Sequence, residues 1–112
     1  MSSNPFARSG ADPDTVDFAE LADAVETGAW TVIDVREPHE FAVGHIPNSI
    51  NLPLSSFDPA ELPQGKPVVL SCQAGGRARN ALARARAAGR ADVKHYPGGM
   101  NGWRMQGGDV TL

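Results

Sequence analysis

PVVLSCQAGGRA, at residues 67–78, carries the strongest structural signal in the chain. Residues 67–72 are apolar apart from Ser71 and include the β-branched pair Val68-Val69, which predicts a strong, buried strand. A loop with two glycines follows, and residues 76–88 are rich in Ala, Leu and Arg, which predicts the strongest helix of the chain. A buried strand, a tight loop and a helix in succession are typical of a parallel α/β sheet.

Strands and helices alternate on both sides of this stretch. Upstream, Asp17 followed by Glu20 resembles a capping box and predicts a helix over residues 17–26, which Gly28 ends. The other expected elements are strands at 30–35, 49–52 and 93–96 and short helical segments at 38–43, 54–62 and 100–103. This alternation predicts an α/β domain in which helices cover both faces of a parallel sheet.

Length and composition fit one globular domain. The chain has 112 residues, of which 41% are hydrophobic and 21% charged, and its net charge is −3. These values argue against a disordered chain and against a nucleic-acid binder, and no apolar run approaches the roughly 18 residues of a membrane span. Residues 1–14 predict a flexible tail without the apolar stretch of a secretory signal, and residues 15–112 the folded domain.

The chain contains a single cysteine, Cys72. It therefore has no internal disulfide, and a free thiol without a secretory signal suggests the cytoplasm, where thiols stay reduced. The three histidines, His39, His45 and His95, lack the spacing of metal ligands, so no metal is expected. No large apolar helix face is left over, which favours a monomer.

Cys72 ends a buried strand, where parallel sheets bind their ligands. Backbone N–H groups of a tight loop and of the next helix can converge there on an anion or a thiolate. The expected anion-binding loop consists of Gln73, Ala74, Gly75, Gly76 and Arg77. Cys72 is thus a candidate nucleophile in an anion cradle, and the alternative is a small buried hydrophobic residue. The Gly75-Gly76 pair favours the first interpretation, because a plain strand-to-helix turn does not need it.

At this point the sequence resembles the rhodanese family of sulfurtransferase domains. Residues 72–78 look like its active-site loop, C-x-x-G-x-R-[SA]. Three further segments fit in the right order: IDVREPHEF at 33–41 (D-x-R…E-[FY]), GHIPNSINLP at 44–53 (G-H-I-P-x-[AS]-x-N-[IL]-P) and GGMNGW at 98–103 (G-G-x-x-x-W). The resemblance covers nearly all of residues 15–107. Asn48 stands where the family usually has Gly, and Ala78 where Ser is commoner.

The resemblance implies a three-layer sandwich whose parallel sheet has about five strands. It also implies a sulfurtransferase, in which the Cys72 thiolate takes the outer sulfur of a small anionic donor such as thiosulfate. The resulting persulfide, held by the loop amides, passes its outer sulfur to cyanide or a thiol. Neither a metal nor an organic cofactor is implied, and a sulfur-relay protein is a further candidate partner.

Two alternatives stand beside this function. The chain could be a non-enzymatic persulfide carrier or interaction module that works with a partner protein. It could also be a phosphatase or an arsenate reductase. Cysteine-based phosphatases use C-x5-R, whereas four residues separate Cys72 from Arg77 here. The smaller ring of amides favours a persulfide sulfur over a tetrahedral phosphoryl group.

Other polar residues of these motifs have structural interpretations beside functional ones. Asp34 and Arg36 either line the pocket or form a supporting ion pair. We expect Glu40 to support Arg36, His45 to be a packing residue rather than a general base, and His95, like His39, to lie at the surface or an edge.

The predicted helix at 76–88 and the residues after it are rich in arginine. The arginines are Arg77, Arg79, Arg84, Arg86 and Arg90. Such a run usually forms a solvated face, and it could attract anionic donors or a partner. Arg77, and to a smaller degree Arg79, would add positive field at the cysteine.

Overall fold

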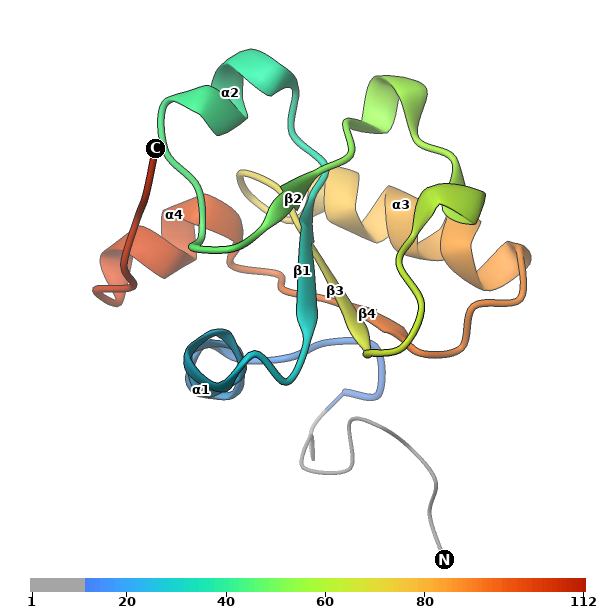
Figure 1. Ribbon diagram of the computed structural model, residues 1–112, viewed down its shortest axis with the longest axis horizontal. Coiled ribbons are helices and arrows are strands. Elements are labelled where there is room, and N and C mark those ends of the chain that lie inside the picture. Colours follow the sequence, from blue (N-terminus) through green and yellow to red (C-terminus); the bar gives the residue numbers. More distant parts are fainter. Residues whose placement is uncertain (1–11) are drawn as a thin grey trace, which may run out of the picture.

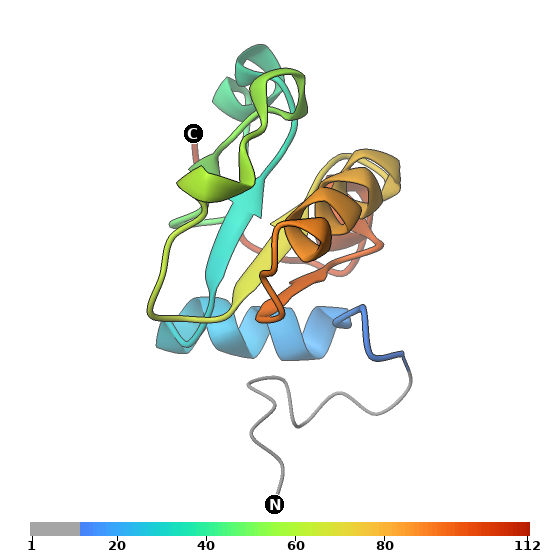
Figure 2. The ribbon, with the colours of Figure 1, turned by 90° about the vertical axis from the view of Figure 1, so that its right-hand side faces the viewer.

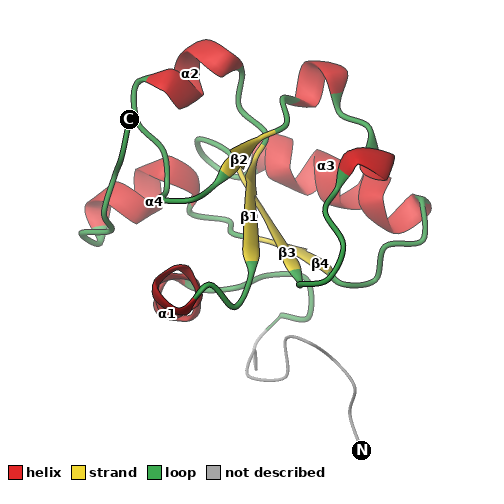
Figure 3. Cartoon of the chain, in the orientation of Figure 1, coloured by secondary structure: helices red, strands yellow, loops and turns green. Residues whose placement is uncertain are grey.

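The computed structural model describes residues 12–112, which form a parallel sheet flanked by helices (Figure 1). The strands are β1 (Thr31–Asp34), β2 (Ile50–Asn51), β3 (Val68–Ser71) and β4 (Val93–His95). The helices are α1 (Phe18–Thr27), α2 (Pro38–Ala42), α3 (Gly76–Ala87) and α4 (Gly99–Met105), with the 3₁₀ turns η1 (Leu54–Ser56) and η2 (Pro59–Glu61). Every element expected from the sequence is present, within two residues at most ends (Figure 3).

Among residues 12–112 the sheet has four strands, in the order β2-β1-β3-β4, where about five were expected. Beside β4, where a fifth strand would pair, Thr15 is the one residue among 12–112 that forms an isolated parallel bridge, with His95. Two hydrogen bonds hold it: Val16 N donates to His95 O at 3.1 Å, and His95 N donates to Asp14 O at 3.0 Å. Pairing stops there because Asp17 already caps α1. The expected tail falls mostly on residues 1–11, outside the described residues.

Two apolar clusters, one on each face of the sheet, form the core. Alternation along β3 separates them, since Val68 and Leu70 face one cluster and Val69 faces the other. The first cluster includes the buried side of α3 and side chains around η1 and η2, and the second includes α1 and α4. In Figure 1, α1 and α4 lie to the left of the strands and α3 to the right. The expected three layers are therefore confirmed.

The expected capping box begins α1. The Asp17 carboxylate accepts from Glu20 N at 2.8 Å, and the Glu20 carboxylate accepts from Asp17 N at 3.0 Å. Gly28 ends the helix with a φ of 75°, the left-handed conformation that favours glycine. In Figure 2, α1 is seen along its length, running across the ends of the strands where β1 begins.

The C-terminal residues fold back over the molecule as a strap, residues 107–112. His45 and Thr111 exchange two backbone hydrogen bonds of 2.9 Å each, and Trp103 Nε1 donates to Asp109 O at 2.7 Å. Figure 1 shows the C-terminus beside α2. The strap thereby covers the indole of Trp103, which is 2% exposed.

Asn48 has a φ of 65° and is the one non-glycine residue with positive φ in the described chain. The left-handed region explains why the rhodanese motif usually has glycine at this place. Asn tolerates this conformation better than other L-residues, so the departure from the motif leaves the turn intact. No helix among residues 12–112 is long and apolar enough to cross a bilayer.

Candidate active site

Cys72 follows β3 directly, at the carboxyl edge of the sheet, and is 1% exposed. Its Sγ accepts from two backbone amides, Gly75 N at 3.1 Å and Ala78 N at 3.4 Å. Both amides belong to the loop that leads into α3 and to its first turn. Amide donors and the positive end of the helix dipole stabilise a thiolate at this position.

The loop holds more amides than the thiol uses. The backbone N–H groups of Gln73, Ala74, Gly76 and Arg77 donate no hydrogen bond to any other part of residues 12–112. All four residues follow Cys72 in the sequence, where the chain turns into α3. An anion bound at Cys72 therefore finds donors that are not engaged elsewhere in the fold.

Two glycines allow the loop to take this shape. Gly75 has a φ of 106°, and a Cβ there would lie 2.7 Å from Pro97 O. Gly99 has a φ of 58°, and its Cβ would lie 2.5 Å from both Cys72 O and Gln73 O. Gly76, by contrast, has open space around it. The requirement for glycine in the loop thus falls on Gly75, and Gly76 contributes its amide.

The first residues of α4 hold the backbone of the Cys72 loop in place through hydrogen bonds. Met100 N donates to Cys72 O at 2.8 Å, and Asn101 N donates to Gln73 O at 3.1 Å. The Gln73 side chain also donates to Asn101 Oδ1 at 2.6 Å. Asn101 was not expected to take part in the site. The sequence feature that could have indicated its role is the glycine pair at 98–99, which lets α4 approach the backbone of the loop.

Arg77 forms a two-pronged ion pair with Glu40 of α2. Its Nη1 and Nη2 lie 2.6 and 3.0 Å from the two carboxylate oxygens. Hydrogen bonding from Arg77 lowers the pKa of Glu40 to about 2, and Glu40 raises the pKa of Arg77. The expectation that Glu40 supports Arg36 is therefore wrong, because its carboxylate binds the arginine of the loop. The electrostatic interactions of Arg77 with Cys72 and Asp34 raise its pKa further.

Asp34 and Arg36 form a buried ion pair, 2% and 3% exposed. Arg36 Nε lies 3.0 Å and Nη2 2.8 Å from Asp34 Oδ2, and Nη2 also donates to Gly44 O at 2.7 Å. Arg36 Nη1 reaches Gln73 Oε1 at 3.3 Å. The two expected roles were lining the pocket and supporting it. The structure fits the second, because the pair contacts the loop through Gln73.

The histidines lie apart from the contacts of Cys72. His45 stacks on Phe41 with ring centroids 3.7 Å apart, and its Nδ1 lies 2.9 Å from Phe41 O, which fits the expected packing role. His39 is exposed, as expected. His95 is only 5% exposed although it lies on the last strand, because the segment at Thr15 covers it. Burial lowers the pKa of His95.

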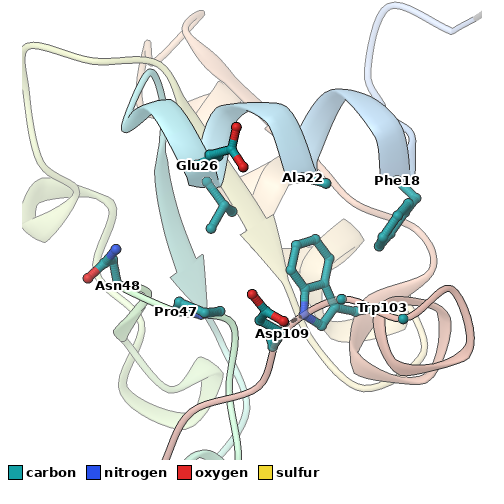
Figure 4. Close-up of a pocket in the computed structure, with 10 residues that line it drawn as sticks. Phe18, Ala22, Glu26, Pro47, Asn48, Trp103 and Asp109 are labelled. Carbon is teal, nitrogen blue, oxygen red and sulfur yellow. Dashed lines mark hydrogen bonds between the residues drawn. The ribbon is translucent and has the colours of Figure 1, made fainter.

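The described residues contain no group of three or more His, Cys, Asp or Glu side chains that could hold a metal ion. They do enclose a cavity of about 360 Å³ between α1 and the strap. Trp103 and Asp109 line one side of it and α1 another (Figure 4). None of the residues that line it belongs to the Cys72 loop, so it is separate from the candidate active site.

Comparison with known proteins identifies the class that this fold and this loop define. The family model for the rhodanese-like domain matches residues 17–106 of this sequence. A rhodanese-related protein from Thermoplasma volcanium has a similar structure, with a TM-score of 0.79 and 32% identity over 88% of this chain and 97% of that one. The chain therefore belongs to the rhodanese family.

Two curated relatives show the range within the family. An uncharacterised protein of Synechocystis is 41% identical over 97 residues, which cover 85% of this chain and 51% of that protein. The thiosulfate:glutathione sulfurtransferase of Saccharomyces cerevisiae is 36% identical over 93 residues, covering 70% of this chain and 67% of that enzyme. The chain spans about half the length, or less, of the first relatives that it matches.

Proposed function

We propose that this chain is a sulfurtransferase in which Cys72 carries sulfur as a persulfide. The observation that supports this most directly is the position of Cys72 Sγ, which accepts from Gly75 N and Ala78 N at the carboxyl edge of the sheet. Membership of the rhodanese family and the similarity to sulfurtransferases support the same reaction class.

The proposed cycle has two displacements at sulfur. The Cys72 thiolate attacks the outer sulfur of thiosulfate, a new S–S bond forms, and sulfite leaves with the electron pair of the broken S–S bond. An acceptor thiolate or cyanide then attacks the outer sulfur of the persulfide. The Sγ–S bond breaks, and Cys72 regains its thiolate. No external oxidant or reductant is needed in either step.

The anion cradle fits the charges of this cycle. The unengaged amides of Gln73, Ala74, Gly76 and Arg77 would hold the anionic persulfide, and the first turn of α3 adds its dipole. Glu40 fixes the guanidinium of Arg77 and pairs its charge, so the positive field at the loop comes mainly from the amides and the helix dipole. The loop side chains are neutral apart from Arg77, so we assign thiosulfate as donor on this field and on the similarity to the yeast enzyme.

A carrier that depends on a partner protein would use the same persulfide but turn over small molecules slowly. The phosphatase or arsenate reductase alternative is weakened by the loop, which places four residues between Cys72 and Arg77. An activated free thiol suits a reducing compartment, so the proposal includes the cytoplasm as location.

The decisive experiment is intact mass spectrometry of the reduced protein after incubation with thiosulfate. We expect a gain of one sulfur atom in the wild type and none in C72A, with the gain removed by cyanide as thiocyanate. An unmodified wild type would contradict thiosulfate as donor. Loading without steady-state production of thiocyanate would instead identify a carrier, and hydrolysis of an aryl phosphate would identify a phosphatase.

A further inference from the structure

The outward face of α3 carries a shallow, open depression, called here the α3 groove, which begins at Gly76, where the Cys72 loop enters the helix. Six exposed residues line it: Gly76, Arg79, Asn80, Ala83, Arg84 and Ala87. Their spacing of three and four residues places them on one side of the helix. The opposite side of α3 is buried in the core through four residues, Ala78, Ala81, Leu82 and Ala85. The groove therefore extends from the loop along the whole length of the helix.

The two arginines of the groove differ from the others nearby. Arg77, Arg86 and Arg90 form ion pairs with acidic side chains, at distances between 2.6 and 2.9 Å. Arg79 and Arg84 have no acidic partner among residues 12–112. In a chain of net charge −3, this face retains two uncompensated positive charges next to the cysteine loop. Such a local field attracts an acidic group despite the overall charge.

The dimensions of the groove indicate what it fits. From Gly76 to Ala87 the helix rises about 16 Å, at about 1.5 Å per residue. A fully extended tripeptide spans only about 10 Å. Small side chains, Ala83 near the middle of the groove and Ala87 at its far end, allow a backbone to approach closely. The length and the small residues fit a peptide segment better than a small thiol.

We propose that the α3 groove binds an acidic segment of a protein that accepts sulfur from Cys72. The inference rests on the proposed function and names the class of its acceptor. Acidic side chains of the segment pair with Arg79 and Arg84, and a thiol at its end reaches the loop beside Gly76. That thiolate attacks the outer sulfur of the persulfide, the Sγ–S bond breaks, and its electron pair returns to Cys72.

The test measures sulfur transfer from the loaded protein to two peptides of equal length, each with one terminal cysteine. One peptide is rich in glutamate, and the other has lysine in place of each glutamate. The protein is loaded with thiosulfate, or with inorganic polysulfide if thiosulfate does not react. Mass spectrometry follows the loss of sulfur from the protein and its gain by the peptide.

We expect the wild type to transfer sulfur about three- to tenfold faster to the acidic peptide, the range of two exposed ion pairs. The preference should disappear in R79Q/R84Q and shrink at high salt. The matched control is K66Q/R104Q, which removes the same charge from exposed residues elsewhere and should keep the preference. Each peptide rate is divided by the rate with 2-mercaptoethanol in the same protein, which corrects for a change in the reactivity of the persulfide itself.

Equal rates with both peptides in the wild type would overturn the proposal, and so would an equal loss of preference in the control variant. A binding measurement separates this result from a failure of the sulfur chemistry. Fluorescence anisotropy of the labelled acidic peptide with C72S needs no persulfide. Binding that R79Q/R84Q weakens severalfold and K66Q/R104Q does not would support the groove even if Cys72 proves not to carry sulfur.

Discussion

Arg77 connects the cysteine loop to α2 through a single ion pair. Its guanidinium binds both oxygens of Glu40, and the side chains are 35% and 25% exposed. Arginine suits this position because its planar fork matches a carboxylate, which lysine cannot do. Glu40 is therefore a positioning residue in the proposed cycle, since it fixes the direction of a charge beside Cys72.

The ion pair predicts a pH dependence of stability. The pKa of Glu40 is lowered from 4.5 to about 2 in the folded chain, so the stabilisation by its carboxylate is present above the unfolded pKa and is lost as the pH falls towards 2. In E40Q, the free energy of unfolding should fall less between about pH 5 and about pH 3 than in the wild type. Urea denaturation at both pH values checks this, with E61Q, an exposed glutamate of η2, as control. Equal pH dependence in E40Q and wild type would contradict the assignment.

The buried ion pair of Asp34 and Arg36 should contribute more to stability than a partly exposed ion pair does. D34N leaves the charge of Arg36 buried without a counter-charge, which should lower the free energy of unfolding by about 3–5 kcal/mol. D92N breaks a half-exposed pair with Arg90 and should cost about 1 kcal/mol or less. Urea denaturation at neutral pH compares them. A D34N variant as stable as D92N would show that the pair does not hold the loop in place.

The loop between β3 and α3 depends on one glycine more than on the other. G75A forces an L-residue to a φ of 106° and brings its Cβ within 2.7 Å of Pro97 O. We expect at least a tenfold slower sulfur loading and a loss of about 1–3 kcal/mol in stability. G76A meets open space and should load at close to the wild-type rate. Rates by mass spectrometry and stabilities by urea denaturation test the pair, and equal loss in both variants would be inconsistent with the geometry.

Elements with strong local signals were predicted well from the sequence. The strand before Cys72, the helix after it and the capping box of α1 depend on neighbouring residues, so periodicity and capping chemistry reveal them. The fold class was predicted correctly, and the expected number of about five strands differs from the observed four because the family pattern does not show that pairing beside β4 stops at Thr15.

Side-chain partners were harder to predict than elements. The nucleophile and its loop follow from one contiguous segment. By contrast, Glu40 and Arg77 are 37 residues apart, and which arginine the carboxylate binds depends on how α2 sits over the loop. The burial of His95 likewise depends on the segment before α1. Asn101 approaches Gln73 only because α4 folds under the loop.

Across the whole molecule, the strap links the C-terminus to the loop after α2 and covers Trp103. Deleting residues 109–112 removes the two hydrogen bonds with His45 and the acceptor of the indole. We expect a loss of about 1–3 kcal/mol in stability and a red shift of the Trp103 emission as water reaches the ring. The shift is measured in a W30F background, which leaves one tryptophan. Unchanged emission would mean that the strap does not shield the indole.

The depth of Cys72 has a consequence for which molecules the chain reacts with. The residue as a whole is 1% exposed, so a bulky alkylating agent or an oxidised protein has little access to its thiol before sulfur is loaded. Loading adds a second sulfur atom about 2.05 Å from Sγ, and that outer atom is the one that an acceptor attacks. In the proposed cycle, compact donors therefore reach the buried atom, and large acceptors meet the outer one. Burial of Cys72 thus selects reactants by size, with small molecules in the donor step and larger ones in the acceptor step.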